Sequence, residues 1–342
     1  MQESSNRRTL LRLCIAACLF AVIVIGMGAF TRLVDAGLGC PDWPGCYGHL
    51  LWPDEAHEVE KANQAWPDAP VEHDKTWPEM VHRYLASGLG LLAIISVGLA
   101  WRGRSQGGPV KLPLFILAFI ILQGMFGMWT VTLKLWPQVV TAHLLGGFTT
   151  FALFWLLALR LRASHWQIPD RMRSALPGLR RLAVLGLVVT VLQITLGGWT
   201  TSNYAAVACP DFPTCQNEWL PEMDFQQGFN VLQEVGPNYL GGAMANEARM
   251  AIHFSHRIGA LITTFILLIL AWRLWRSEWS PAQRIAPVLL VVLGLQVLLG
   301  IGNVVLQFPL WVAVAHNLGG AFLLLTLVTI NYGLWTAREP HR

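Results

Sequence analysis

Apolar residues gather into eight long blocks separated by shorter polar stretches, and this pattern dominates the chain. The blocks are Leu10–Thr31, Met80–Trp101, Leu112–Thr132, Val139–Leu161, Leu182–Thr201, Ala251–Trp275, Ala286–Leu306 and Trp311–Trp335. Each block is long enough to cross the hydrocarbon core of a bilayer, about 30 Å, as an α-helix. Lipid offers the backbone no hydrogen-bond partner, so the blocks have to be helical. The pattern predicts an all-α integral membrane protein with eight transmembrane helices.

Composition agrees with this class of protein. Of 342 residues, 54% are hydrophobic and only 13% are charged. The first block follows Arg7, Arg8 and Arg12, as the core of a secretory signal would. It is too long for a signal and lacks a clear cleavage site, so we expect a retained helix. The net charge of +4 reflects an uneven distribution of charge along the chain and does not indicate a nucleic-acid surface.

Charged residues are divided between the two sides of the predicted membrane. The tails and the loops after the second, fourth and sixth blocks hold 17 of the 24 Lys and Arg residues, whereas 16 of the 20 acidic residues lie on the opposite side. Basic residues stay on the cytoplasmic side, which predicts that both termini are cytoplasmic in a bacterial inner membrane. Two long loops, Arg32–Glu79 and Ser202–Met250, then face outward, toward the periplasm.

The chain contains an internal repeat. The segment from Cys40 to Cys46 recurs from Cys209 to Cys215 with an offset of 209 − 40 = 169, and each copy belongs to a half with four predicted helices. Both copies start on the same side of the membrane, which predicts two four-helix bundles related by a pseudo-two-fold axis along the membrane normal. We expect an N-terminal half at 1–161, a cytoplasmic linker at 162–181 and a C-terminal half at 182–342.

Four histidines occupy matching places in the two halves. His256 follows His82 by 174 residues, and His316 follows His143 by 173. One histidine in a membrane helix often serves only helix packing, but four in repeat register favour two metal sites. Two imidazoles facing each other across a helical bundle are the axial ligands of a haem iron, and a zinc site would require further ligands. All four are expected near the outward ends of their helices, with His82 at the start of its helix.

The repeat is broken one helical turn before the first ligand. Glu79 precedes His82 by three residues, whereas the second half has His253 before His256. An acid in a first helical turn can simply stabilise the helix dipole, but a carboxylate beside one iron site can also relay protons or stabilise positive charge. We therefore expect the first half to be the reactive one. No role for His253 follows from the sequence.

Two arginines directly follow the second-helix ligands. Arg83 comes after His82, and Arg257 comes after His256. Either arginine could pair with a haem propionate, or could extend to the membrane interface without a specific role.

The outer loops each contain two cysteines six residues apart. These are Cys40 and Cys46 in the first loop and Cys209 and Cys215 in the second. The outer side of a bacterial inner membrane permits disulfides, so one disulfide per loop is predicted. A redox-active role for one pair stays open, because an exposed or strained disulfide is the reactive kind.

These motifs together resemble the haem A synthases of the CtaA/Cox15 family, over essentially the whole chain. The resemblance is carried by the segment 28–38, by Glu79-x-x-His82-Arg83 and by Ala315-His316-Asn-Leu-Gly-Gly320. It implies a haem b cofactor in the C-terminal half, held by His256 and His316 with Arg257 nearby. It also implies that the N-terminal half binds the substrate haem O through His82 and His143, with Arg83 nearby and Glu79 as the catalytic carboxylate.

The reaction implied is oxidation of a haem O ring methyl to a formyl group by successive hydroxylations. The expected partners are membrane lipid, the substrate haem O, a haem O synthase that delivers it and an electron-transfer partner that the sequence does not name. A homo-oligomer stays open, because lipid-facing and partner-facing apolar surfaces look alike. Two other functions also stay open, an electron-carrying dihaem cytochrome b and a membrane thiol oxidoreductase that uses the outer cysteines.

Overall fold

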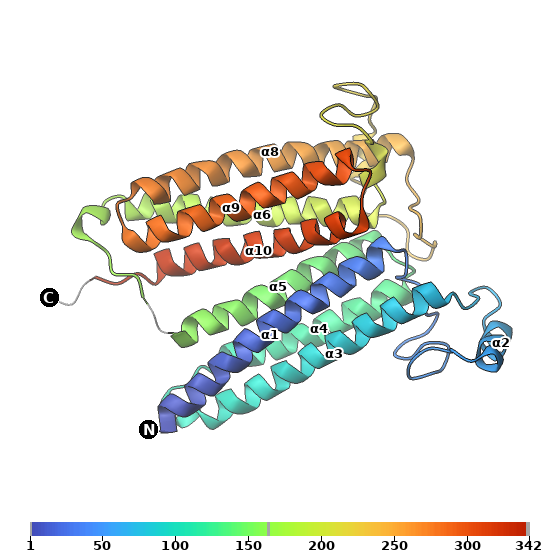
Figure 1. Cartoon of the computed structure of the whole chain (residues 1–342), viewed down its shortest axis with the longest axis horizontal. Helices are drawn as coiled ribbons and strands as arrows, with labels where there is room; N and C mark the ends of the chain where they lie inside the picture. Colours follow the sequence, from blue (N-terminus) through green and yellow to red (C-terminus); the bar gives the residue numbers. More distant parts are fainter. Residues whose placement is uncertain (1, 163–164, 340–342) are drawn as a thin grey trace.

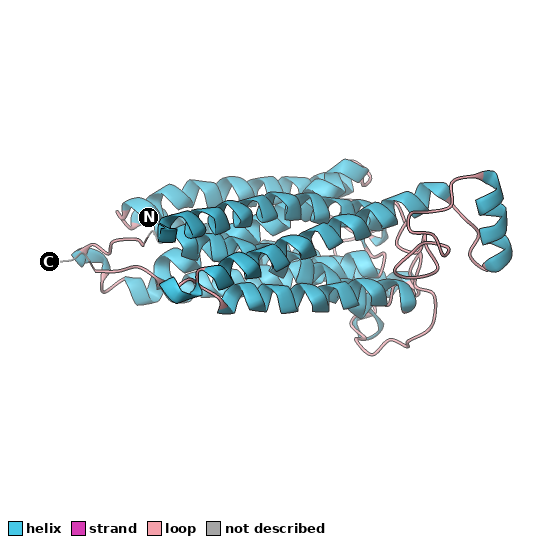
Figure 2. Ribbon diagram, turned by 90° about the horizontal axis from the view of Figure 1, so that it is seen from below, coloured by secondary structure: helices cyan, strands magenta, loops and turns pink. Residues whose placement is uncertain are grey.

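The computed structural model describes residues 2–162 and 165–339, and its described residues form long helices with no β-strand (Figure 2). Eight of these helices are long and apolar enough to cross a membrane, which confirms the predicted number of spans and identifies a multi-pass membrane protein. They are α1 (Gln2–Leu33), α3 (His73–Arg102), α4 (Lys111–Thr132), α5 (Pro137–Arg162), α6 (Leu176–Ser202), α8 (Asn246–Arg276), α9 (Ser280–Val305) and α10 (Leu310–Trp335).

Several helices begin before the apolar block that predicted them. Helix α3 starts at His73, seven residues before the predicted start at Met80, and continues through Pro78. Polar residues and a proline hid this extension, because the hydrophobic pattern marks only the part of a helix that meets lipid. The expectation that His82 opens its helix was therefore wrong, since His82 is the tenth residue of α3.

The helices of each half pack against one another, and the halves meet along α1, α5, α6 and α10 (Figure 1). The first half shares a buried cluster that includes Phe151 and Phe154 of α5 and extends to Leu324 of α10. A second cluster lies among α6, α8, α9 and α10. The described contacts do not test the predicted symmetry axis, and the two-bundle arrangement stays a prediction.

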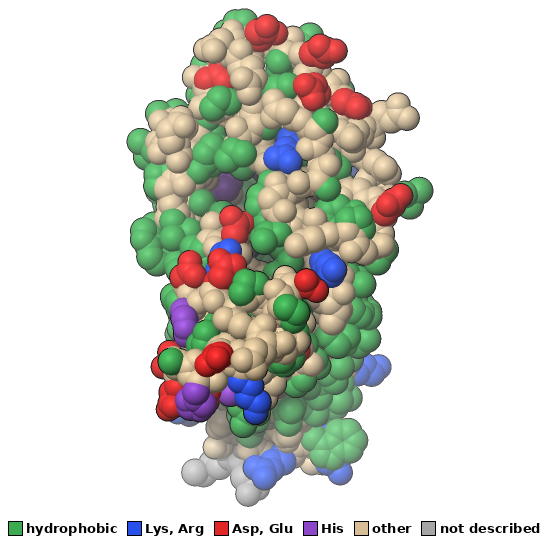
Figure 3. Space-filling model, turned by 90° about the vertical axis from the view of Figure 1, so that its right-hand side faces the viewer, with side chains coloured by type: hydrophobic (Ala, Val, Ile, Leu, Met, Phe, Trp, Pro, Cys, Tyr) green, Lys and Arg blue, Asp and Glu red, His purple; other side chains and the backbone are tan. Residues whose placement is uncertain are grey.

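The two long loops lie at one end of the molecule, and both termini lie at the other (Figure 1). The first loop contains the helix α2 (Ala56–Ala65), which projects away from the membrane helices, and the second contains the short helix α7 (Phe225–Gly228) (Figure 2). A capping box between Glu55 and Glu58 starts α2. Acidic side chains are scattered over this end of the molecule (Figure 3).

Part of the predicted linker at 162–181 belongs to helices. Helix α5 extends to Arg162, a 3-10 turn covers Asp170–Met172, and α6 begins at Leu176. Residues 163 and 164 of this linker lie outside the described residues. Pro177 falls in the first turn of α6, where a proline costs little because the backbone N–H has no helical partner there.

Candidate functional site

The four histidines form two facing pairs. The ring centres of His82 and His143 are 6.3 Å apart, with the ring planes at 90°. The ring centres of His256 and His316 are 6.5 Å apart, with the planes at 83°. The pairs join α3 to α5 in the first half and α8 to α10 in the second. The structure thus brings together the residues that the repeat register predicted as partners.

The geometry of each pair fits one metal ion bound between two imidazoles. Two metal–nitrogen bonds of about 2 Å each, with the ring radii added, place the ring centres on the order of 6 Å apart. Among the described residues, no group of three or more His, Cys, Asp and Glu side chains could hold a metal ion. A closed zinc site is therefore not supported in the described parts of the chain, whereas a bis-histidine haem site matches the donor set.

A glycine from the neighbouring helix lies against each imidazole. A β-carbon added at these glycines would come within 2.7 to 3.3 Å of the ring Cε1 atom, in the pairs Gly28–His82, Gly127–His143, Gly197–His256 and Gly300–His316. Contacts that close are rare for real β-carbons, so each ring occupies space that only glycine leaves free. The same helix-to-ring contact thus occurs four times in the molecule.

Both predicted disulfides are present, Cys40–Cys46 and Cys209–Cys215. Each loop is also held by an aspartate that accepts two backbone hydrogen bonds. Asp42 accepts from the amides of Tyr47 and Gly48 at 2.6 and 2.8 Å. The matching Asp211 accepts from the amides of Gln216 and Asn217 at 2.7 and 3.0 Å. The two loops are built alike.

Arg83 and Arg257 attach these loops to the helices that carry the ligands. The guanidinium of Arg83 donates to the carbonyls of Gly45 and Asp42 at 2.6 and 3.0 Å. Arg257 donates to the matching carbonyls of Thr214 and Asp211, at 2.7 and 2.9 Å. These contacts with the loop backbone account for both side chains, and the pairing with haem propionates stays a prediction.

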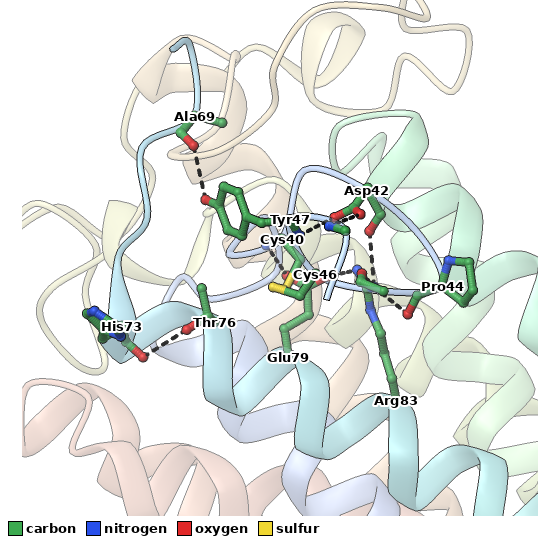
Figure 4. The surroundings of a disulfide bond; sticks show 12 residues. Cys40, Asp42, Pro44, Cys46, Tyr47, Ala69, His73, Thr76, Glu79 and Arg83 are labelled. Atoms are coloured by element: carbon green, nitrogen blue, oxygen red, sulfur yellow. Dashed lines mark hydrogen bonds and ion pairs between the residues drawn. A yellow bond between two sulfur atoms is a disulfide. The ribbon is translucent and has the colours of Figure 1, made fainter. Parts of the chain in front are cut away.

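The halves differ at Glu79, which is only 4% exposed. Its carboxylate accepts a hydrogen bond from the Cys40 amide at 2.9 Å and forms an ion pair with Arg83 (Figure 4). His253, at the matching position, is 5% exposed, and its Nδ1 has no hydrogen-bond partner among the described residues. Only the first half therefore joins its disulfide loop to a buried carboxylate one turn before a ligand.

Sequence reasoning assigned no role to three glutamines that lie beside the histidines. The amide nitrogen of Gln123 lies 3.0 Å from Nδ1 of His143, and that of Gln193 lies 3.0 Å from Nδ1 of His256. Gln296 occupies the corresponding place on α9, with its Oε1 against Gly319, three residues after His316. A Gln-x-x-x-Gly that recurs on the helix before three of the four histidines is the signal that could have revealed these residues, since polar residues inside lipid are costly.

Comparison with known proteins gives matches to one protein family over most of the chain. Residues 11–328 match the family model COX15-CtaA, described as a cytochrome oxidase assembly protein. The chain is 49% identical to the haem A synthase of Shewanella oneidensis over 92% of this chain and 94% of that relative. It is 30% identical to the haem A synthase of Allorhizobium ampelinum over 99% and 95%, and 29% identical to that of Sphingopyxis alaskensis over 90% and 87%.

Proposed function

The chain belongs to the COX15-CtaA family of cytochrome oxidase assembly proteins and acts as a haem A synthase, and we propose that it oxidises a ring methyl of haem O to a formyl group. The observation that carries this proposal is the break in symmetry between two similar histidine pairs. His82 and His143 have a buried carboxylate one turn upstream, at Glu79, whereas His256 and His316 have none. The first pair binds the substrate haem O, and the second binds the haem b cofactor.

Conversion of the methyl to a formyl group takes its oxygen from one water and releases four electrons and four protons, of which two protons come from the methyl carbon and two from the water. The first hydroxylation replaces one C–H bond with C–O and gives an alcohol, with the loss of two electrons and two protons. The second gives a geminal diol with the same loss, and the diol then expels water to leave the formyl group. The four electrons pass to a redox partner that accepts them one at a time.

Glu79 is the residue we assign to the chemistry. Removing electrons and a proton from a methyl on a conjugated ring leaves positive charge on the carbon, and a nearby carboxylate stabilises that charge until water adds. The ion pair with Arg83 and the hydrogen bond from Cys40 hold this carboxylate in place.

In the second half, His256 and His316 would hold haem b, which supplies one-electron transfer. The glycines Gly197 and Gly300 leave room for the two rings. Among the described residues near this pair, His253 takes the place of the carboxylate. This half therefore offers ligands without an acid positioned to stabilise charge on a substrate.

We further propose that the protein spans the inner membrane of a bacterium, with both termini in the cytoplasm and both haem sites toward the periplasmic side. The basic residues of the tails and of the loops at their end of the molecule support this orientation. Haem O would reach the first site through the membrane or from a haem O synthase.

The test is to express the protein with a source of haem O and identify the extracted haems by mass. The expected result is haem A from the wild type and none from His82→Ala. A dihaem electron carrier would return the haems unchanged, and a thiol oxidoreductase would tolerate His82→Ala while failing after Cys→Ser changes in the loops. Either of these results would refute the proposal.

A further inference from the structure

Three of the four histidines share a neighbour that the fourth lacks. A glutamine stands four residues before the contacting glycine in Gln123–Gly127, Gln193–Gly197 and Gln296–Gly300. Before Gly28, which contacts His82, the corresponding residue is Val24. The register is not in doubt, because 193 − 24 and 197 − 28 both equal 169, the offset of the disulfide loops.

Two of the three glutamines, Gln123 and Gln193, form the same hydrogen bonds with their histidines. The Gln123 amide nitrogen donates to the carbonyl of His143 at 2.6 Å, and that of Gln193 donates to the carbonyl of His256 at 2.9 Å. Both nitrogens also lie 3.0 Å from the Nδ1 of the same histidine. In this arrangement the amide nitrogen faces Nδ1, and an imidazole that carries its proton on Nδ1 would require the amide to rotate so that its oxygen accepts that proton.

The amide oxygens of Gln193 and Gln296 are buried without a hydrogen-bond partner among the described residues. Nδ1 of His316 is also buried with no such partner in the described parts of the chain. An unpaired buried polar atom costs on the order of 1–3 kcal/mol. An imidazole that binds iron through Nε2 carries its proton on Nδ1, and a rotation of the Gln296 amide would bring its oxygen to accept that proton. Ligand binding would thus satisfy a donor and an acceptor that the protein alone leaves open.

Each glutamine also requires a glycine one turn after its histidine. A β-carbon at Gly146, Gly259 or Gly319 would overlap Oε1 of the neighbouring glutamine. The residue three positions after His82 is instead Leu85. Val24 and Leu85 both belong to the apolar core of the first half, Val24 as a buried member and Leu85 packed against it. At His82, therefore, both the glutamine and the glycine that leaves room for it are replaced by apolar residues.

The loss leaves His82 without a side-chain partner. Its Nδ1 is buried without a hydrogen-bond partner among the described residues, and neither the Val24 side chain nor the Leu85 side chain offers an acceptor. A glycine contacts the ring at all four histidines, so the side chain four residues before that glycine is what differs at His82. A hydrogen bond to the second nitrogen orients a ligating imidazole and strengthens its bond to the metal. His82 should hence form the weakest of the four bonds to iron.

We propose that Gln123, Gln193 and Gln296 are positioning residues for three haem ligands, and that His82, which lacks one, is the ligand that leaves the iron. This inference rests on the proposed function, because only a substrate site has to take up haem O and release haem A in every turnover. His143 keeps hold of the iron while His82 opens, and the cofactor site keeps both of its ligands.

The first test measures the release of haem to excess apomyoglobin from the full-length protein loaded at both sites with iron protoporphyrin IX. We expect two phases, of which the faster is absent when His82→Ala is combined with His143→Ala, because the first site then has no ligand for the iron. Val24→Gln combined with Leu85→Gly installs the missing pair and should slow the fast phase by on the order of 10- to 100-fold. Gln283→Leu, on α9 but bonded only to the Trp275 carbonyl, should change neither phase.

A second readout needs no change at His82 and covers the case in which the double variant fails to fold. Gln193→Leu removes the acceptor from His256 and should raise the midpoint potential of the second haem, whereas Gln193→Glu offers a stronger acceptor and should lower it. A role in packing alone would not produce shifts of opposite sign.

The outcomes separate the inference from the proposed function. Release in a single phase, a fast phase unaffected by the double variant, or potentials unaffected by either change at Gln193 would overturn the inference and leave the proposed function standing. A wild-type protein that binds no haem at the histidine pairs would overturn both.

Discussion

The two halves of this molecule share almost all of their construction and differ at a few buried positions. Each half has a disulfide loop held by an aspartate and an arginine, and a pair of histidines whose ring centres lie 6.3 or 6.5 Å apart. The differences gather around His82. There a carboxylate replaces a histidine at Glu79, and apolar residues replace a glutamine and a glycine at Val24 and Leu85.

The comparison of the two halves distinguishes residues that build a proposed haem site from residues that serve its reaction. Features present in both halves, such as the arginine that holds the loop, serve the scaffold. Features present in one half are candidates for turnover. Relative to the second half, the first half has an additional buried acid, Glu79, and lacks the glutamine beside its first histidine. A site that reacts with its haem and then releases it needs this combination.

The largest expected effect is at Glu79. Glu79→Gln removes the negative charge but keeps the shape, and should lower haem A formation by roughly 100-fold or more, because stabilisation of developing charge is worth that much. The matching change His253→Gln should leave formation nearly unaltered. Both are measured by the mass of extracted haems, with total haem as the control. Equal effects of the two changes would remove the distinction between the halves.

The next effect concerns the glycine that faces His82. In Gly28→Ala the new methyl would lie 2.7 Å from the ring Cε1 atom, so the ring has to move away from its ligating position. Haem affinity of the first site should fall on the order of tenfold. Gly98→Ala, where nothing lies within 4 Å of the added carbon, is the matched control. Titration with haem measures the affinity of both variants. An unchanged haem affinity in Gly28→Ala would contradict the claim that His82 needs the space left by this glycine.

Removing the disulfides should show a smaller difference between the halves. Cys40→Ser with Cys46→Ser, or Cys209→Ser with Cys215→Ser, should each lower the free energy of unfolding by about 2 kcal/mol, since the closed loops are equally short. Haem A formation should fall more in the first variant, because the Cys40 amide bonds to Glu79. Thermal unfolding and product mass give the two numbers. An equal loss of product in both variants would mean that the loop does not position the carboxylate.

The smallest effect is expected where the halves join. The hydroxyl of Tyr204 accepts from Arg32 at 2.6 Å and donates to Asp35 at 2.9 Å. Tyr204→Phe keeps the ring beneath the guanidinium and should cost about 1 kcal/mol of stability. Haem content and haem A formation should stay as in the wild type. A fall in either would show that this contact affects the sites themselves.

The sequence predicted the features that depend on hydrophobicity and on the repeat. The eight helices followed from lipid's demand for paired backbone groups, and the partners of each histidine followed from the shared register. The disulfides followed from two cysteines six residues apart in each outer loop. These features need only the order of residue types along the chain.

Other features depend on side-chain packing and were missed. The hydrophobic pattern ends where lipid ends, so it could not show that α3 starts at His73 or that the first loop contains α2. Apart from Glu79, the partners of Arg83 are backbone carbonyls, which carry no sequence signal. The glutamines beside the ligands did leave a signal, Gln-x-x-x-Gly, but its meaning depends on which ring faces the glycine.

The most direct test of the central claim, that the two halves do different work, compares the haems bound by two double variants produced with a source of haem O. His256→Ala with His316→Ala should retain haem O that is not converted, and should lack haem b. His82→Ala with His143→Ala should retain haem b alone. If both variants bind the same haem, or if haem A still forms without the first pair, the division of labour between the halves is wrong.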